Sequence, residues 1–238
     1  MLEVDNLSKR FGGLTAVRDI SLALAEGEIL GLIGPNGAGK TTFFNCVAGA
    51  MAPSAGRVRI GGEDVTGQKA HKLCRAGIGR TYQIVKPFAG LTVRDNVMVG
   101  ALNRAESLAE ARRFTEEALE ITGLAPIGDD LASSLPLPRR KRLEVARALA
   151  TRPKVLLLDE VMAGLNPSEV DRAIVLIRAI RDSGISVLII EHLMRVIMAV
   201  SDRIVVMHHG EKLAEGKPAE VMADPRVVKA YLGEGFNA

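Results

Sequence analysis

A glycine-rich loop followed by a lysine and two threonines gives the chain its clearest chemical signal. Gly34–Thr42 (GPNGAGKTT) fits the spacing G-x-x-x-x-G-K-[ST]. The backbone N–H groups of such a loop can surround a phosphate, Lys40 adds a positive charge toward the β- and γ-phosphates, and the Thr41 hydroxyl can ligate Mg²⁺. The sequence therefore predicts that the whole loop binds a nucleoside triphosphate with Mg²⁺: Gly34, Pro35, Asn36, Gly37, Ala38, Gly39, Lys40, Thr41 and Thr42.

The segments on either side of the loop have the properties that phosphate binding requires. The apolar run 28–33 predicts a buried strand, and residues 40–50, which precede Pro53, predict a helix. A glycine-rich turn without a ligand is the alternative, but such a turn does not need a strand before it and a helix after it.

Polar side chains follow two further predicted strands. Asp159 and Glu160 follow the apolar run 155–158, and His192 follows 186–190. Ligands of open α/β sheets bind at the carboxyl ends of strands, where the glycine loop also lies. We expect Asp159 to ligate Mg²⁺, Glu160 to act as general base toward water, and His192 to contact the γ-phosphate or orient that water. Any one of them alone could be an ordinary strand-end residue, but the set favours hydrolysis.

Two other signals carry less chemistry. Phe11 stands in a predicted Gly-Gly turn and is a candidate surface for a nucleotide base, with a core phenylalanine as the alternative. His71 and Cys74 have helical spacing, but two ligands do not make a metal site, so a helix surface is expected there.

The composition excludes several classes of protein. The 238 residues are 47% hydrophobic, enough for one large domain or a core with an inserted subdomain. The net charge of +3 and an aromatic content of 3% without Trp argue against nucleic-acid binding. Two cysteines fit a reduced, cytosolic setting without a disulfide framework. No signal-like segment and no apolar run near the roughly 18 residues of a membrane span occurs, so any membrane partner is expected to be another chain.

The order of patterns predicts an α/β fold with a mainly parallel central sheet, an N-terminal antiparallel β subdomain and an inserted α-helical subdomain. The core is predicted to comprise 1–87 and 151–238, and the helical insertion 88–150. Alternating or apolar runs predict strands, and helical spacing with polar caps predicts helices. Ser107 with Glu110 predicts a capping box at one helix start, and Asn166, Pro167 and Glu169 predict the N-cap, N1 and N3 of another. The predicted strands are 2–7, 19–24, 57–60, 155–158, 186–190 and 203–207, and the predicted helices include 92–101, 107–122 and a basic helix from 139 to 150.

These motifs, in this order, resemble the ATP-binding subunit of an ABC transporter over essentially the whole chain. The resemblance implies that Phe11 stacks on adenine, that Gly34–Thr42 is the Walker A motif, and that His192 is the switch histidine. It further implies that VLLLDE, which ends at Glu160, is the Walker B motif with the catalytic glutamate, and that 163–166 is the D-loop.

The resemblance also assigns a role to a residue that no local pattern singles out. Gln83, in RTYQIVKPF, matches the Q-loop glutamine, which senses Mg²⁺ and contacts the transmembrane partner. Gln83 is therefore expected to belong to both the catalytic and the metal-binding residues.

Longer segments are similar to one of the two ATPases that branched-chain amino acid importers pair together. They include FGGLTAV, RTYQIVKPFAGLTVRDNVMVGA and the C-terminal GKPAEVMADPRVVKAYLGE. This implies uptake of hydrophobic amino acids, or of urea or short amides, with specificity residing in other subunits. The implied partners are transmembrane permease subunits, a second ATP-binding subunit and, indirectly, a solute-binding protein, with no nucleic acid. The implied location is cytoplasmic and peripheral, on the inner face of the cell membrane.

The chain departs from the family at the signature motif LSGGQ, where 135–139 reads LPLPR. In the family, this motif of one subunit donates hydrogen bonds to the γ-phosphate held by the other. Pro136 and Pro138 have no N–H to donate, and Leu137 is apolar where the backbone should approach closely. We therefore expect one active and one degenerate site in a heterodimer with an intact partner, or two poor sites in a homodimer.

The sequence leaves three alternatives to an importer ATPase. A regulatory subunit with little hydrolysis fits LPLPR but not the retained Glu160 and His192. A related ATPase of DNA repair or translation usually has coiled coils or two ATPase halves, which are not seen here. An unrelated P-loop kinase or GTPase remains possible on the loop alone, although no N-K-x-D guanine motif occurs.

Overall fold

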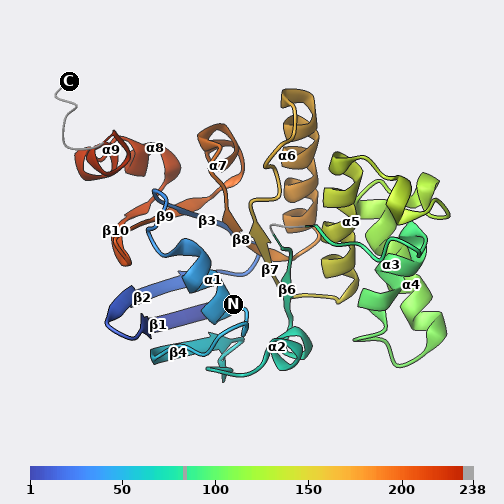
Figure 1. Ribbon diagram of the computed structural model, residues 1–238, viewed down its shortest axis with the longest axis horizontal. Helices are drawn as coiled ribbons and strands as arrows, with labels where there is room; N and C mark the ends of the chain where they lie inside the picture. Colours follow the sequence, from blue (N-terminus) through green and yellow to red (C-terminus); the bar gives the residue numbers. More distant parts are fainter. Residues whose placement is uncertain (83–84, 233–238) are drawn as a thin grey trace. The chain divides into compact units, whose positions relative to one another are not determined.

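The computed structural model describes residues 1–82 and 85–232 (Figure 1). By their contacts, the residues form two compact units. The first comprises Met1–Leu73 and Ser186–Ala238, and the second comprises Cys74–Ile185. The chain passes from the first to the second within α2 (Ala70–Ala76), which carries His71 and Cys74 as predicted.

The first unit contains the antiparallel β subdomain that the sequence predicts. The strands β1 (Leu2–Phe11), β2 (Leu14–Leu24), β4 (Ala55–Ile60) and β5 (Glu63–Asp64) form a sheet in the order β2-β1-β4-β5. Both β1 and β2 run further than the alternation indicates, because their polar ends still pair across the tight Gly12-Gly13 turn.

The first unit also holds strands that are mainly parallel. The strand β3 (Ile29–Ile33) pairs in parallel with β8 (Ser186–Ile190) on one side and with β9 (Arg203–His208) on the other. Every residue of β3 and β8 is buried, as expected of strands covered on both faces. The strand β10 (Glu211–Gly216) is antiparallel to β9. The described residues of this unit also form the helices α1 (Lys40–Val47), α7 (Met194–Val200), α8 (Pro218–Met222) and α9 (Pro225–Leu232).

The second unit combines two parallel strands with a group of helices. Together with the antiparallel sheet and the parallel strands of the first unit, this confirms the predicted α/β class. The strand β6 (Ile78–Arg80) pairs in parallel with the fully buried β7 (Val155–Asp159). Its helices are α3 (Val93–Ala101), α4 (Leu108–Ile121), α5 (Leu137–Ala150) and α6 (Pro167–Asp182), with 3₁₀ turns at Ala125–Ile127 and Ala132–Ser134. In the part of the chain that the structure describes, no helix has the length and apolar character needed to cross a membrane.

Helix caps of the second unit test two sequence predictions. Asn166 caps α6, and Glu169 completes a capping box by accepting from the Asn166 N–H at 2.9 Å, as predicted. Ser107 caps α4 by accepting from the Glu110 N–H, also as predicted. The predicted return bond is wrong, because the Glu110 carboxylate accepts from the N–H of Glu106 instead.

A buried amide fixes the segment that leads into α3. Asn96 is fully buried, and its side-chain N–H groups donate to the backbone oxygens of Phe88 and Thr92 at 3.1 and 2.8 Å. Its oxygen accepts from the Phe88 N–H at 2.9 Å. Because an unpaired buried amide is costly, these bonds hold residues 88–92 in one conformation. No sequence motif indicated this role.

Candidate nucleotide-binding site

The glycine-rich loop joins β3 to α1 in the first unit and is closed by its own lysine. Lys40 is only 6% exposed, and its Nζ donates to the backbone oxygens of Gly34 and Pro35 at 2.6 and 3.0 Å. Gly39 caps α1 in the left-handed region, at φ 97°. The loop therefore has a lysine charge and a helix N-terminus at its centre.

Two of the glycines are required by close backbone packing. A Cβ on Gly34 would overlap the backbone oxygen of Met207 in β9, and a Cβ on Gly39 would overlap that of Ala16 in β2. Gly37, in contrast, has open space around it. The close packing and the internal lysine leave the loop as a preformed cradle of backbone groups, which fits a phosphate chain.

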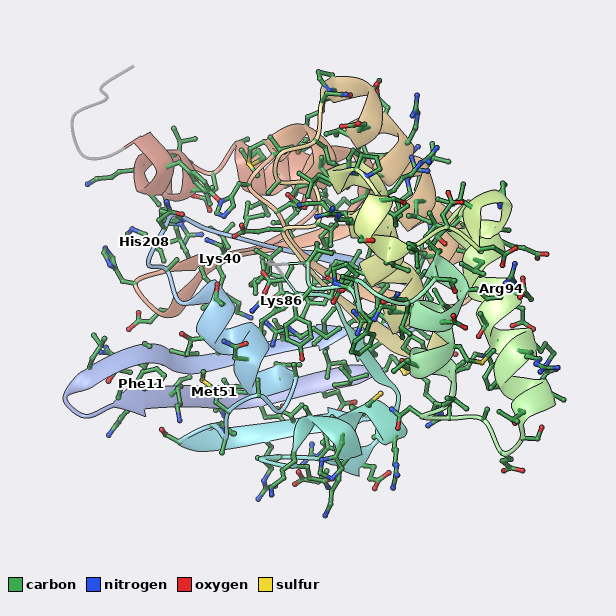
Figure 2. The ribbon with its side chains drawn as sticks, turned by 45° about the vertical axis from the view of Figure 1, so that its right-hand side comes forward. Phe11, Lys40, Met51, Lys86, Arg94 and His208 are labelled. Carbon is green, nitrogen blue, oxygen red and sulfur yellow. The ribbon has the colours of Figure 1, made fainter. Side chains whose placement is uncertain are left out.

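The side chains at the rim of this loop are accessible to a ligand. Thr41, the predicted magnesium ligand on the loop, is exposed at the first turn of α1. Phe11 lies at the tip of the β1–β2 hairpin and is 48% exposed, with Lys9 Nζ 5.1 Å from its ring centroid (Figure 2). An exposed ring can stack on a base, which a core phenylalanine cannot.

The predicted switch histidine follows a strand next to the loop strand. In the parallel pair of β3 and β8, Leu32 lies opposite Ile190. The segments that follow these strands, the loop from Gly34 and the exposed His192, therefore leave the sheet at the same end.

One residue near the loop was not found from the sequence. Tyr231 of α9 hydrogen-bonds to the backbone of Gly34, and burial raises the pKa of its hydroxyl to about 12, with the Gly34 bond acting in the opposite direction. The contact brings the C-terminal helix of the first unit against the start of the loop. Nothing in the local sequence around Tyr231 signals it.

The second unit carries the predicted magnesium ligand. Asp159 ends β7, is 3% exposed, and its carboxylate pairs with Arg80 Nη2 at 3.1 Å. Its N–H donates to Thr81 Oγ1 at 3.2 Å. No group of three His, Cys, Asp or Glu residues suited to a metal occurs among the described residues. A single carboxylate ligand is enough for Mg²⁺, which takes most of its ligands from water and phosphate.

The predicted general base has an unusual backbone. Glu160 adopts φ 49°, in the left-handed region that costs a residue with a side chain about 1 to 3 kcal/mol. Its backbone oxygen accepts from Lys141 Nζ and from the Ala163 N–H, each at 3.3 Å. The turn after β7 is thus held by its own Ala163 N–H and by Lys141 of α5.

Gln83 lies outside the described residues, but the residues flanking it are held by α5. Glu144 accepts from the Tyr82 N–H, while burial raises the pKa of the Glu144 carboxyl and Arg147 at 3.3 Å opposes that rise. Arg147 Nη1 donates to the Lys86 backbone oxygen at 3.2 Å, and its guanidinium lies 4.8 Å from the Phe88 ring centroid.

The LPLPR segment begins α5. Pro136 is the N-cap without a side-chain hydrogen bond, and Pro138 lies in the first turn. Arg140 could have replaced the missing donors, but its Nε donates to the Leu135 oxygen at 2.6 Å and its Nη2 to the Ser133 oxygen at 3.0 Å. The two prolines of the segment have no N–H group to donate, whereas the exposed Arg139 keeps its guanidinium as a donor.

Sequence comparisons identify relatives that cover nearly the whole chain. A family model described as ABC transporter matches residues 17–163, and one described as branched-chain amino acid ATP-binding cassette transporter matches 211–237. The chain is 40% identical over 252 residues to the high-affinity branched-chain amino acid transport ATP-binding protein BraF of Pseudomonas aeruginosa, covering 98% of both. It is 40% identical over 237 residues to the lipopolysaccharide export system ATP-binding protein LptB of Escherichia coli, covering 99% of this chain and 98% of that protein.

The backbone has a close match among solved structures. It is similar to an ATP-binding cassette of an ABC transporter in its ADP conformation, with a TM-score of 0.88 and 31% identity. The match covers 98% of this chain and 99% of the other.

The close packing of Gly34 predicts that adding one methyl group there weakens ATP binding. Gly34→Ala should weaken ATP binding about tenfold or more, because the loop must shift away from the Met207 oxygen and lose donors to the phosphates. Titration with a fluorescent ATP analogue measures the dissociation constant. The control is Gly90→Ala, which adds the same methyl group where nothing lies within 4 Å. Wild-type affinity in Gly34→Ala would contradict the tight-packing argument.

Proposed function

The chain belongs to the ATP-binding subunits of ABC transporters, and from that premise we propose that it hydrolyses ATP to power an importer of branched-chain or other hydrophobic amino acids. The observation that carries the choice of solute is the match of 211–237 to the branched-chain cassette model. Overall identity does not decide it, because the chain is as similar to a lipopolysaccharide export subunit as to BraF. Urea and short amides are the alternative solutes.

Four of the predicted site residues hold the nucleotide and its metal ion in this proposal. Lys40 neutralises the β- and γ-phosphates, Thr41 and Asp159 ligate Mg²⁺, and Phe11 stacks on adenine. The bound Mg²⁺ supplies charge that stabilises the transferring phosphoryl group. Two observations support these roles. Lys40 Nζ lies within the loop, where it donates to the Gly34 oxygen, and the side chains of Phe11 and Thr41 are exposed.

The remaining residues act on water and on the partner. Glu160 accepts the proton of the attacking water, and His192 orients that water or contacts the γ-phosphate. Gln83 and the helical insertion 88–150 transmit closure of two ATP-binding subunits to the permease. The contacts of α5 with both flanks of Gln83 support this path.

The implied assembly has several subunits. We propose transmembrane permease subunits, a solute-binding protein that acts through them, and a position of this chain on the inner face of the membrane. The second ATP-binding subunit is proposed to be a different chain with an intact signature motif. A homodimer is the alternative.

The LPLPR segment makes the two ATP sites of the proposed assembly unequal. The site on this chain's own loop turns over when a partner lends a normal signature, and the opposite site, completed by LPLPR, turns over poorly. The proline positions and the internal bonds of Arg140 support this asymmetry. A regulatory subunit with little hydrolysis is the second candidate, favoured by the same segment and opposed by the retained Glu160 and His192.

Uptake by cells tests the function. In cells lacking this gene, the wild-type chain should restore uptake of labelled leucine, excess valine should compete, and excess lysine should not. Glu160→Gln should lose most of the uptake, because the general base is gone, whereas the exposed Glu26→Gln should restore it fully. Full restoration by Glu160→Gln would contradict the catalytic role, and competition by lysine but not valine would contradict the solute class.

Repair of the signature tests the asymmetry. Replacing LPLPR at 135–139 by LSGGQ should raise ATPase activity about tenfold or more, since two or three donors to a charged phosphate are regained. The matched control is Arg139→Gln alone, which keeps both prolines and should give no gain. Absence of a gain from LSGGQ, in the isolated chain and in the assembled transporter, would contradict the proposal.

A further inference from the structure

One face of α5 carries three charged side chains at a spacing of three residues. Lys141 donates to the Glu160 backbone oxygen, Glu144 accepts from the Tyr82 N–H, and Arg147 donates to the Lys86 backbone oxygen. Each therefore contacts the backbone of a segment that the function requires. Lys141 is the one that reaches the turn after β7.

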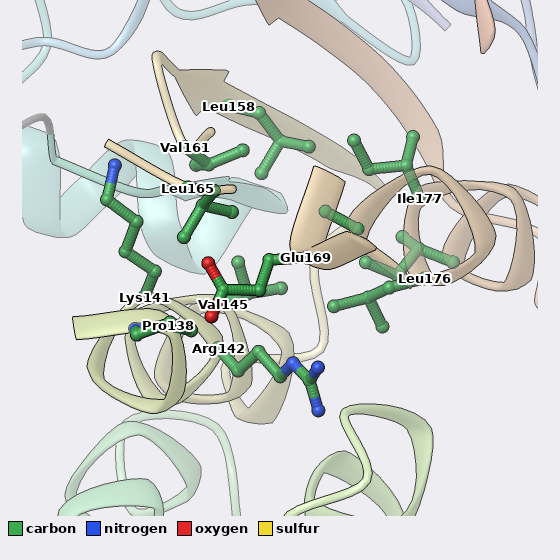
Figure 3. A pocket seen from close by; sticks show the side chains of 12 residues that line it. Pro138, Lys141, Arg142, Val145, Leu158, Val161, Leu165, Glu169, Leu176 and Ile177 are labelled. Carbon is green, nitrogen blue, oxygen red and sulfur yellow. The ribbon is translucent and has the colours of Figure 1, made fainter. Parts of the chain in front are cut away.

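The surroundings of Lys141 are unusual for a lysine. It is 7% exposed and lies along a mostly apolar cavity, with Val145 of the same helix and Val161 and Leu165 of the turn after β7 among the lining residues (Figure 3). Its side chain extends toward the segment that carries Val161. Burying an ammonium costs free energy, so a lysine here needs a reason beyond filling space.

The partner atom suggests that reason. Glu160 holds a left-handed backbone conformation that its side chain disfavours, and it does so directly after the buried Asp159. An ammonium on the Glu160 oxygen favours the orientation of that carbonyl, together with the Ala163 N–H. The same carbonyl orientation fixes where the Glu160 side chain starts.

We propose that Lys141 is a positioning residue for hydrolysis, which holds the Glu160 backbone so that its carboxylate faces the attacking water. The inference rests on the proposed role of Glu160 as general base. It makes hydrolysis at this chain's own loop depend on the start of α5, a few residues beyond LPLPR. Lys141 itself is not expected to contact the nucleotide.

The variants separate the charge from the packing. Lys141→Met keeps an unbranched apolar chain in the cavity and removes the donor, while Lys141→Arg keeps a donor. The matched control is Arg142→Met, which removes a charge from the adjacent position of the same helix and lines the same cavity. All are made in the full-length chain, and denaturant unfolding checks that each variant folds.

The first measurement reports the position of the backbone. Hydrogen exchange followed by mass spectrometry should show faster exchange across 159–165 in Lys141→Met, with wild-type exchange in Lys141→Arg and in Arg142→Met. This readout needs neither ATP nor a partner. Unchanged exchange in Lys141→Met would overturn the inference.

The second measurement reports the catalytic consequence. In steady-state ATPase assays of the transporter assembled with each variant, kcat of Lys141→Met should fall about tenfold with KM within about twofold of wild type, and Lys141→Arg should recover most of it. A loss confined to KM, or a loss of stability with kcat intact, would overturn the inference. Glu160→Gln is assayed in parallel. If Glu160→Gln keeps full kcat, the proposed role of Glu160 fails, whereas the exchange result still judges the Lys141 contact separately.

Discussion

The shape of the glycine-rich loop depends on the hydrogen bonds from Lys40 to the two carbonyl oxygens at the start of that loop. Two glycines of the loop pack so closely against the backbones of β2 and β9 that neither has space for a side chain. The antiparallel sheet and the parallel strands are therefore needed together, since each supplies one wall of the cradle. Tyr231 adds a third contact from the C-terminal helix.

In the second unit, side chains of α5 hold the backbone segments that carry the predicted catalytic residues. Its start carries Pro136 as the N-cap and Pro138 in the first turn, and neither proline has an N–H group to donate. Its next three turns hold the turn at Glu160 and both flanks of Gln83. The proposed asymmetry of the two sites therefore concerns the start of α5, whereas the contacts with Glu160 and the flanks of Gln83 come from the turns that follow.

Much of this could be predicted because the signals are local. The glycine spacing, the apolar run before Asp159 and the polar cap at Asn166 each lie within one short segment. Residues with distant backbone or charged partners could not be found this way. Lys141 bonds to an oxygen 19 residues further along the chain, and Arg80 pairs with a carboxylate 79 residues away. The strand β6 was missed because three residues are too few for a periodic pattern.

The most direct test concerns the start of α5, and it measures solution mass by light scattering. Glu160→Gln with ATP and Mg²⁺ should stay at the mass of one chain, 25.4 kDa, while binding ATP, because two LPLPR segments are expected to close over the nucleotides too weakly to hold a homodimer. The same variant with LSGGQ at 135–139 should reach twice that mass. A stable dimer of Glu160→Gln with its natural LPLPR would contradict the account.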